Sequence, residues 1–303
     1  MDEQTRRTGV PRRTVLSALG VAGVTAAGLG LALNGSAPLG EALRLAVGIA
    51  GPKPAGKRAV VRVERVHSAA RGQDVDLLTI LPPGATPKNL PMSILLHGLH
   101  GNARYAAVGG MVEVFTSAVV RGAVPPFGFV AVDGGDNYWH ENIPGDDPMA
   151  MLLEEVPRWL AERGLGGADG LPFACTGVSM GGFGALLYAR RRAERRRPLQ
   201  AVATIAPGLL TSWPEMAKRK AFANADQWAS LDPLKHLPEL GDTPVGVWIG
   251  DQDRFIVGTR QFIKAKHPAV GSIGPGGHDD RFFRRAVPDV IRFVGKRVPK
   301  SGA

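Results

Sequence analysis

The chain carries the sequence GVSMGG at residues 177–182, in which Ser179 stands between two glycines at the spacing G-x-S-x-G. An apolar run at residues 171–176 precedes it, and a run of small and apolar residues at 183–190 follows it. This is the pattern of a nucleophile elbow, a sharp turn that presents a serine oxygen at the N-terminus of a helix. Glycines two positions either side of the serine let the two chain segments pass without a side-chain clash. The stretch therefore predicts a strand, a tight turn and a helix in that order.

Apolar patterns on both sides of this motif predict the rest of the fold. Two segments with strand-like alternation, 60–66 and 75–81, suggest an antiparallel entrance to a sheet. Continuous apolar runs predict buried strands, and helical patterns occur between and beyond them. The strands are expected at 92–96, 127–132, 201–205 and 245–249, and the helices at about 148–163 and 255–266. Such alternation implies an α/β domain with a mostly parallel central sheet and helices on both faces, which binds ligands beyond the carboxyl ends of its strands.

The chain divides into an N-terminal segment and one catalytic domain. Residues 1–37 read as a twin-arginine-type signal peptide or an N-terminal anchor, because Arg12 and Arg13 precede an uncharged stretch rich in glycine and alanine. Cleavage after the small residues 35–37 is one alternative, and retention of residues 15–33 as an anchor is the other. A cytoplasmic protein with an apolar N-terminal helix is the third. A linker is expected at 38–57 and the catalytic domain at 58–303, with residues 208–240 forming a lid or a peripheral helical pair.

The charge of the chain is +10, and it is not confined to the N-terminal segment. Arginines are concentrated at residues 190–197, at the end of the helix that follows Ser179, where cations favour the helix dipole. No aromatic residue interrupts this run, so nucleic-acid binding is not expected. An anionic envelope surface is the predicted partner for such a patch, against the simpler interpretation of a solvated face. The single cysteine, Cys175, excludes an internal disulfide and is expected to be a buried residue of the strand before Ser179.

A nucleophilic serine needs a general base, and the base needs an acid that holds its tautomer. In the chain order Ser, acid, His, the histidines after Ser179 are His236, His267 and His278. His278 is the predicted base because it lies in a glycine-containing loop before the last amphipathic helix. His267 is expected to cap a helix, and His236 belongs to the 208–240 insertion.

The predicted acid follows the strand at 245–249, which ends in the sequence GDQDRF at residues 250–255. Asp253 precedes a helix and can reach under the histidine loop, whereas Asp251 is expected to bond the backbone of the turn. An oxyanion hole also requires two backbone N–H groups. Met180, which follows the nucleophile, supplies one, and Leu99 in the glycine-containing loop after residue 96 is expected to supply the other.

Two further groups of residues are candidates for substrate contact. His97 and His100 lie three apart on the loop that contains Leu99, a weak metal-ligand pattern without a nearby carboxylate or cysteine, so no metal site is predicted. They are instead candidates for substrate contact, with a supporting structural role as the alternative. Tyr138 and Trp139, in the loop after the strand at 127–132, are candidates for lining the pocket, or are ordinary aromatic anchors.

In this order, the sequences LLHGL at 95–99, GVSMGG at 177–182, GDQD at 250–253 and GH at 277–278 resemble the α/β-hydrolase fold. More narrowly, they are similar to the branch that contains esterase D and the antigen 85-type mycolyltransferases, over residues 58–296. The resemblance implies Ser179 as nucleophile, Asp253 as acid and His278 as base, with oxyanion N–H groups from Leu99 and Met180. An acyl-chain tunnel signature and the mycolyltransferase carbohydrate pattern are not found, which leaves the substrate open.

These patterns lead to one main hypothesis and three alternatives. The main one is an exported serine esterase that hydrolyses a small-molecule, lipid or sugar ester through an acyl-enzyme, without a metal or cofactor. The first alternative is an envelope acyltransferase that moves the acyl group to a sugar or lipid alcohol. The second is a non-catalytic envelope-binding protein on a hydrolase scaffold. The third, a cytoplasmic thioesterase, is disfavoured by the twin-arginine pattern.

Overall fold

The computed structural model describes residues 58–300 of the 303-residue chain. The expected signal or anchor at 1–37 and the linker at 38–57 lie outside the described residues. Residues 58–300 belong to one compact unit. Among the helices of residues 58–300, none is both long and apolar enough to cross a bilayer.

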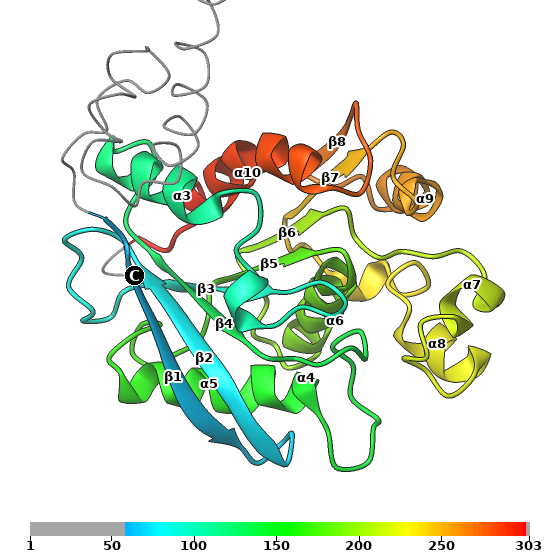
Figure 1. Cartoon of the computed structure of the whole chain (residues 1–303), viewed down its shortest axis with the longest axis horizontal. Helices are drawn as coiled ribbons and strands as arrows, with labels where there is room; N and C mark the ends of the chain where they lie inside the picture. The colour runs from blue at the N-terminus through cyan, green and yellow to red at the C-terminus, as the bar shows by residue number, and fades with distance from the viewer. Residues whose placement is uncertain (1–57, 301–303) are drawn as a thin grey trace, which may run out of the picture. The chain divides into compact units, whose positions relative to one another are not determined.

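One eight-stranded sheet forms the centre of the described part (Figure 1). Its spatial order is β1-β2-β4-β3-β5-β6-β7-β8. The first two pairings, β1 with β2 and β2 with β4, are antiparallel, and all the others are parallel. The strands are β1 Val60–Ser68, β2 Gln73–Leu81, β3 Met92–Leu96, β4 Gly128–Val132, β5 Ala174–Val178, β6 Ala201–Ile205, β7 Val245–Gly250 and β8 Val270–Gly274. This is the mostly parallel α/β sheet that the sequence predicted, with the antiparallel entrance at its start.

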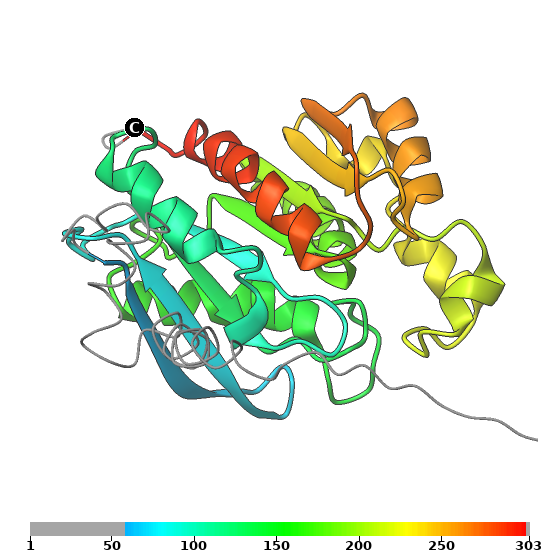
Figure 2. The same cartoon turned by 45° about the horizontal axis from the view of Figure 1, so that its top comes forward.

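Helices cover both faces of the sheet, and each face has its own apolar core (Figures 1 and 2). Helices α3 and α10 pack on one face, and η2, α5 and α6 pack on the other. The remaining short helices lie in the connections between strands. The helical elements are η1 Ala103–Tyr105, α3 Met111–Val120, α4 Pro148–Ala150, η2 Met151–Glu155, α5 Val156–Glu162, α6 Met180–Glu194, α7 Trp213–Ala217, α8 Ala225–Leu231, η3 Pro238–Leu240, α9 Ile256–Lys266 and α10 Asp280–Gly295.

Strand β8 and helix α3 were not predicted from the sequence. Strand β8 pairs only with β7 at the edge of the sheet, and it alternates between half-buried and exposed residues. Its five-residue sequence VGSIG includes two glycines, so it lacks the apolar run of a buried strand. Helix α3 begins after Gly110, which has a left-handed backbone and provides no side-chain cap. Neither element therefore carries a strong start signal in the sequence.

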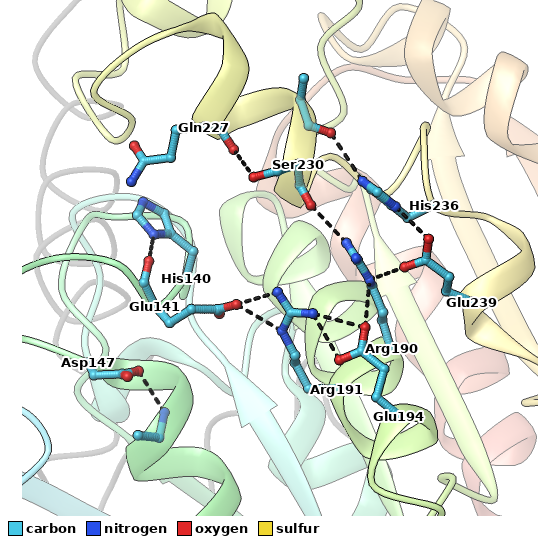
Figure 3. Close-up of polar contacts among 12 residues, drawn as sticks. His140, Glu141, Asp147, Arg190, Arg191, Glu194, Gln227, Ser230, His236 and Glu239 are labelled. Carbon is cyan, nitrogen blue, oxygen red and sulfur yellow. Dashed lines mark hydrogen bonds and ion pairs between the residues drawn. The ribbon is translucent and has the colours of Figure 1, made fainter.

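The insertion at 208–240 contains α7, α8 and η3, and polar contacts tie it to α6 (Figure 3). Arg190 on α6 pairs with Glu239 and donates to the carbonyl of Ser230 at 2.9 Å. Arg191 pairs with Glu141 in the loop after β4 and with Glu194 on its own helix, the latter at 2.9 Å. These bonds fasten the insertion and the β4 loop to the same helix.

The same contacts compensate part of the positive charge of the arginine-rich run at 190–197. Besides Arg190 and Arg191, Arg195 pairs with Glu154 at 3.1 Å, and Arg192 is buried and donates to the carbonyls of Pro172 and Arg197. Most of this positive charge is therefore compensated within the protein. The run offers a weaker attraction to an anionic surface than its composition suggested.

We expect one aromatic cluster to contribute strongly to stability. Phe127 is fully buried, and its ring centroid lies 4.8 Å from Phe115, 5.0 Å from Phe129 and 5.7 Å from Phe173, all edge to face. Phe127→Ala should lower the free energy of unfolding by about 3–5 kcal/mol, because it removes a large side chain and leaves a cavity. Urea unfolding measures this change. Tyr105→Ala, at a side chain 71% exposed, is the matched control, and equal losses in both variants would contradict the prediction.

Candidate active site

Ser179 occupies a strained turn between β5 and α6. Its backbone angles are φ 55° and ψ −120°, a conformation that residues with a side chain rarely adopt. Two neighbouring segments hold it there, since its N–H donates to the Ile205 carbonyl at 2.9 Å and its carbonyl accepts from the Gly208 N–H at 2.7 Å. The end of β6 thus fixes the serine from both sides of its peptide unit.

The glycines of the motif are required by close backbone contacts. A Cβ on Gly177 would lie 1.9 Å from the Gly181 carbonyl oxygen, and one on Gly181 would lie 2.2 Å from the Leu96 carbonyl oxygen. Strand β5, the start of α6 and the end of β3 therefore meet at distances that exclude any larger residue. This crossing is the physical reason for the G-x-S-x-G spacing.

The three side chains proposed as a catalytic set lie within hydrogen-bonding distance of one another. The Ser179 Oγ lies 3.0 Å from His278 Nε2, and His278 Nδ1 lies 2.8 Å from Asp253 Oδ2. Asp253 is 2% exposed, so its carboxylate interacts with the imidazole out of contact with bulk water. When Nδ1–H donates to Asp253, Nε2 presents its lone pair to the serine hydroxyl. This arrangement can accept the serine proton as the oxygen attacks an acyl carbon.

The two aspartates of the β7–α9 loop have different partners. Asp253 Oδ1 accepts from the Phe255 N–H at 2.9 Å, which orients its other oxygen toward His278. Asp251 Oδ1 accepts from the Gly276 N–H at 3.0 Å, so it supports the backbone of the loop that carries His278. Asp253 thus faces the histidine, and Asp251 bonds the backbone of the histidine loop and not that of its own turn.

Aromatic rings flank the His278 imidazole. The centroids of Phe255 and Phe283 lie 5.1 Å and 5.6 Å from it, both edge to face. The side chain remains 13% exposed. The other two histidines lie elsewhere: His267 is the exposed C-cap of α9, and His236 bonds Glu239 and the Ala229 carbonyl within the insertion.

The backbone groups expected to form an oxyanion hole lie on either side of the serine. Met180 is the first residue of α6, where an α-helix leaves its N–H without an intrahelical partner. On the other side, a Cβ on Gly98 would lie 3.3 Å from Ser179 Cβ and 3.9 Å from its Oγ, so the β3 loop passes directly beside the nucleophile. Leu99, the next residue, is half-buried against the core.

His97 supports this loop and does not face a substrate, which corrects its assignment to substrate contact. Its ring is fully buried, accepts from the Gly134 N–H at Nε2 (3.0 Å) and donates from Nδ1 to the Gly98 carbonyl (2.8 Å). The neutral tautomer with hydrogen on Nδ1 satisfies both bonds. Desolvation by burial lowers the pKa of His97, which favours this neutral form.

Tyr138 and Trp139 are also buried and act as supports, so their assignment to substrate contact is corrected too. Trp139 is fully buried, and its indole N–H donates to the His97 carbonyl at 3.2 Å. Tyr138 is 1% exposed and packs edge to face on Phe183 at 5.2 Å. Such burial leaves these rings almost no surface for a ligand. They hold the β4 loop against α6 beneath the site.

His100 lies at the exposed end of the same β3 loop. Its side chain is 79% exposed, and Asp136 accepts from its backbone N–H at 2.6 Å and bonds its ring Nδ1 at 2.8 Å. In residues 58–300, no group of three His, Cys, Asp or Glu side chains is arranged to hold a metal ion.

Sequence reasoning missed one carboxylate that organises the site. Asp133, directly after β4, accepts from the Ala103 N–H at 2.8 Å and from the Asp76 N–H at 2.8 Å. It thereby joins the β3 loop to β2. An aspartate at the carboxyl end of a buried strand was the available signal.

Cys175 is buried within β5 as expected, and burial raises the pKa of its thiol.

The chain belongs to the esterase family whose model is described as "Putative esterase", which matches residues 68–259. This match includes Ser179 and Asp253 and ends before His278. Family membership supports an esterase or hydrolase activity with a small-molecule ester as substrate. None of the curated protein sequences matches this chain.

Solved structures share the α/β-hydrolase fold with this chain. A ferulic acid esterase aligns with a TM-score of 0.66 at 18% identity, over 80% of this chain and 100% of its own. An S-formylglutathione hydrolase from Agrobacterium tumefaciens aligns with a TM-score of 0.64 at 18% identity, over 80% of this chain and 97% of its own. MPT51 of Mycobacterium tuberculosis aligns with a TM-score of 0.60 at 15% identity, over 80% of this chain and 100% of its own. At these identities the likeness establishes the fold.

The burial of His97 leads to a prediction for stability against pH. In the unfolded chain His97 takes up a proton below about pH 6.5, whereas burial opposes this protonation in the folded protein. The free energy of unfolding therefore decreases as the pH is lowered, by at most about 1.4 kcal/mol per pH unit. His97→Gln, which cannot titrate, should lose less stability between pH 7 and pH 5. Urea unfolding across this range measures both proteins.

Asp232 contributes in the opposite direction and is present in both proteins. Burial raises its pKa to about 6, so the folded state takes up a proton before the unfolded state does, which stabilises it as pH falls through 6. Subtracting the free energy of unfolding of His97→Gln from that of the wild type at each pH removes the contribution of Asp232, because both proteins contain it. Identical pH slopes in the two proteins would contradict the role given to His97.

Proposed function

We propose that this protein is an exported serine esterase. Ser179 attacks the carbonyl carbon of a carboxylic ester while His278 Nε2 takes the hydroxyl proton. The tetrahedral intermediate then expels the alcohol, which receives that proton from His278, and an acyl-enzyme remains. Water, deprotonated by His278, then attacks the acyl carbon. The bond from that carbon to Ser179 Oγ breaks, the serine oxygen takes the proton back from His278, and the acid leaves. Asp253 keeps the imidazole in the required tautomer and stabilises its protonated form throughout.

A single observation carries this proposal: the hydrogen-bonded series from Ser179 Oγ to His278 to Asp253, at 3.0 Å and 2.8 Å. The strained backbone of Ser179 supports it, because such strain concentrates at functional sites. The N–H groups of Met180 and Leu99 are the proposed oxyanion hole. In comparable enzymes, removing one such donor costs about 3–4 kcal/mol of transition-state stabilisation.

Substitution of the proposed catalytic residues tests the mechanism. Ser179→Ala should abolish labelling by a fluorophosphonate probe and hydrolysis of p-nitrophenyl esters, because the nucleophile is removed. Asp253→Asn should lower kcat by about 10⁴-fold, as the loss of the acid does in other Ser-His-Asp enzymes. The matched control is Asp251→Asn, whose carboxylate bonds only backbone in the loop and should have a much smaller effect. Hydrolysis that survives in Ser179→Ala would exclude this serine from the reaction.

The same assay separates hydrolysis from acyl transfer. An ester panel of increasing chain length, with and without added sugar alcohols, reports both the preferred acyl group and the acceptor. Release of free acid alone supports the esterase, whereas a new sugar ester favours an envelope acyltransferase. The non-catalytic envelope-binding alternative predicts no fluorophosphonate labelling. The internal ion pairs of the 190–197 run weaken that alternative, because they reduce the charge available for adhesion.

The proposal that the protein is exported rests on the sequence of residues 1–37. Arg12 and Arg13 precede an uncharged segment, as in substrates of the twin-arginine pathway. The double substitution Arg12→Lys and Arg13→Lys should retain the protein in the cytoplasm, because the pathway reads the arginine pair and not charge alone. Cell fractionation with a reporter fused at the C-terminus measures this. Unchanged export in the variant would contradict the assignment, and Arg6→Lys with Arg7→Lys is the control.

A further inference from the structure

Two arginines beside the site have no acidic partner. Arg219 follows α7 in the insertion, and Arg254 follows Asp253 in the β7–α9 loop. Within residues 58–300, neither guanidinium forms an ion pair or a side-chain hydrogen bond. The Nε of Arg219 is moreover buried without any hydrogen-bond partner. A buried charged donor without a partner is costly, on the order of 1–3 kcal/mol or more.

Both guanidiniums lie next to the aromatic ring that touches the proposed base. The Cζ of Arg254 is 5.3 Å from the Phe255 centroid, and the Cζ of Arg219 is 5.9 Å from it. The Phe255 centroid is in turn 5.1 Å from that of His278. Both cations therefore adjoin the same ring that packs against the imidazole.

The charges of the two arginines also act on a ring beside the nucleophile. Burial raises the pKa of Tyr138, and the positive charges of Arg219 and Arg254 oppose this shift. Tyr138 is itself close to the serine, because a Cβ on Gly208 would lie 3.3 Å from the Tyr138 ring and 3.3 Å from the Ser179 carbonyl oxygen.

Other arginines around the site show the contrast. Arg71 is buried behind the β4 loop and pairs with both oxygens of Asp146, at 2.6 and 2.8 Å. Arg190 and Arg191 pair with glutamates, as described above. The protein therefore supplies carboxylates to these cations, and leaves the pair beside Phe255 without one. Guanidinium groups bind carboxylates and phosphates through parallel N–H donors, which suits an external anion.

We propose that Arg219 and Arg254 form an anion subsite for the ester substrate, so that the preferred ester carries a carboxylate or a phosphate away from the scissile bond. This inference rests on the proposed esterase function and names its substrate class. The subsite binds and orients; the bond changes remain those of Ser179 and His278. The anion can belong to the acyl part or to the alcohol part of the ester, and the experiment distinguishes the two.

The experiment compares charged esters with neutral ones of the same shape. For an anion in the alcohol part, the anionic esters are 4-acetoxybenzoate and 4-acetoxyphenyl phosphate, and the neutral ester is 4-acetoxybenzamide. For an anion in the acyl part, the anionic ester is mono-4-nitrophenyl adipate, and the neutral one is its terminal amide. The readout is the ratio of kcat/KM for each anionic ester to that of its neutral counterpart. We expect wild type to prefer an anionic ester on one side. Arg219→Gln and Arg254→Gln should each reduce that ratio by about 10-fold, mainly through KM, and added salt should reduce it in wild type.

The matched control is Arg158→Gln, at an exposed arginine of α5, which removes the same net charge outside the proposed subsite. It should keep the wild-type ratio, and thermal melting of every variant checks folding. A wild type that hydrolyses the neutral esters but shows no preference for any anionic one would overturn the subsite and leave the esterase intact. So would a preference that survives in the double variant Arg219→Gln with Arg254→Gln.

A binding measurement keeps the test independent of turnover. Ser179→Ala protein is titrated by calorimetry with 4-acetoxybenzoate, 4-acetoxyphenyl phosphate and mono-4-nitrophenyl adipate, alone and with both arginine substitutions added. A dissociation constant for the preferred anion that rises about 10-fold or more on losing the arginines supports the subsite. Equal affinity, or no binding of any probe, overturns it. Failure of all esters to be hydrolysed by wild type, with arginine-dependent binding retained, would overturn the esterase proposal alone.

Discussion

The close approach of β5, α6 and the end of β3 at Ser179 is the constraint on which the rest of the site depends. With backbone atoms where a Cβ on Gly177 or Gly181 would lie, the chain can make the turn only through glycine. The turn holds Ser179 in a strained conformation, and bonds from Ile205 and Gly208 keep it there. Its hydroxyl is thereby held beside the β3 loop and the His278 ring, at the edge where a ligand can reach it.

The parallel sheet brings the other participants to the same edge. Asp253 and His278 follow β7 and β8, and the β3 loop lies beside β5, so residues far apart in the chain converge beyond the carboxyl ends of adjacent strands. Further polar side chains hold the loops that carry these residues in place. His97 and Asp133 satisfy backbone N–H groups of the β3 and β4 loops, and Asp251 bonds the loop that carries His278. Each of these groups acts on a main-chain position.

Charge is distributed by the fold in a way that composition does not reveal. The arginine-rich end of α6 is largely consumed in internal pairs that fasten the insertion and the β4 loop (Figure 3). Arg219 and Arg254, which nothing in the sequence distinguishes from other arginines, lie unpaired beside Phe255. Free positive charge therefore adjoins the proposed reaction centre, and the most arginine-dense segment of the chain is partly neutral.

Local sequence determined the sheet class, the elbow, the order of Ser179, Asp253 and His278, and the burial of Cys175, because each depends on periodicity or short-range backbone geometry. Edge strand β8 and helix α3 escaped prediction, since pairing on one side and packing against α10 stabilise them more than their own residues do. The tertiary structure alone decided that His97, Tyr138 and Trp139 support the site from within, and which arginines find partners. Burial and ion pairing join residues from distant segments, so their outcome is set by the folded chain and leaves no signature along the sequence.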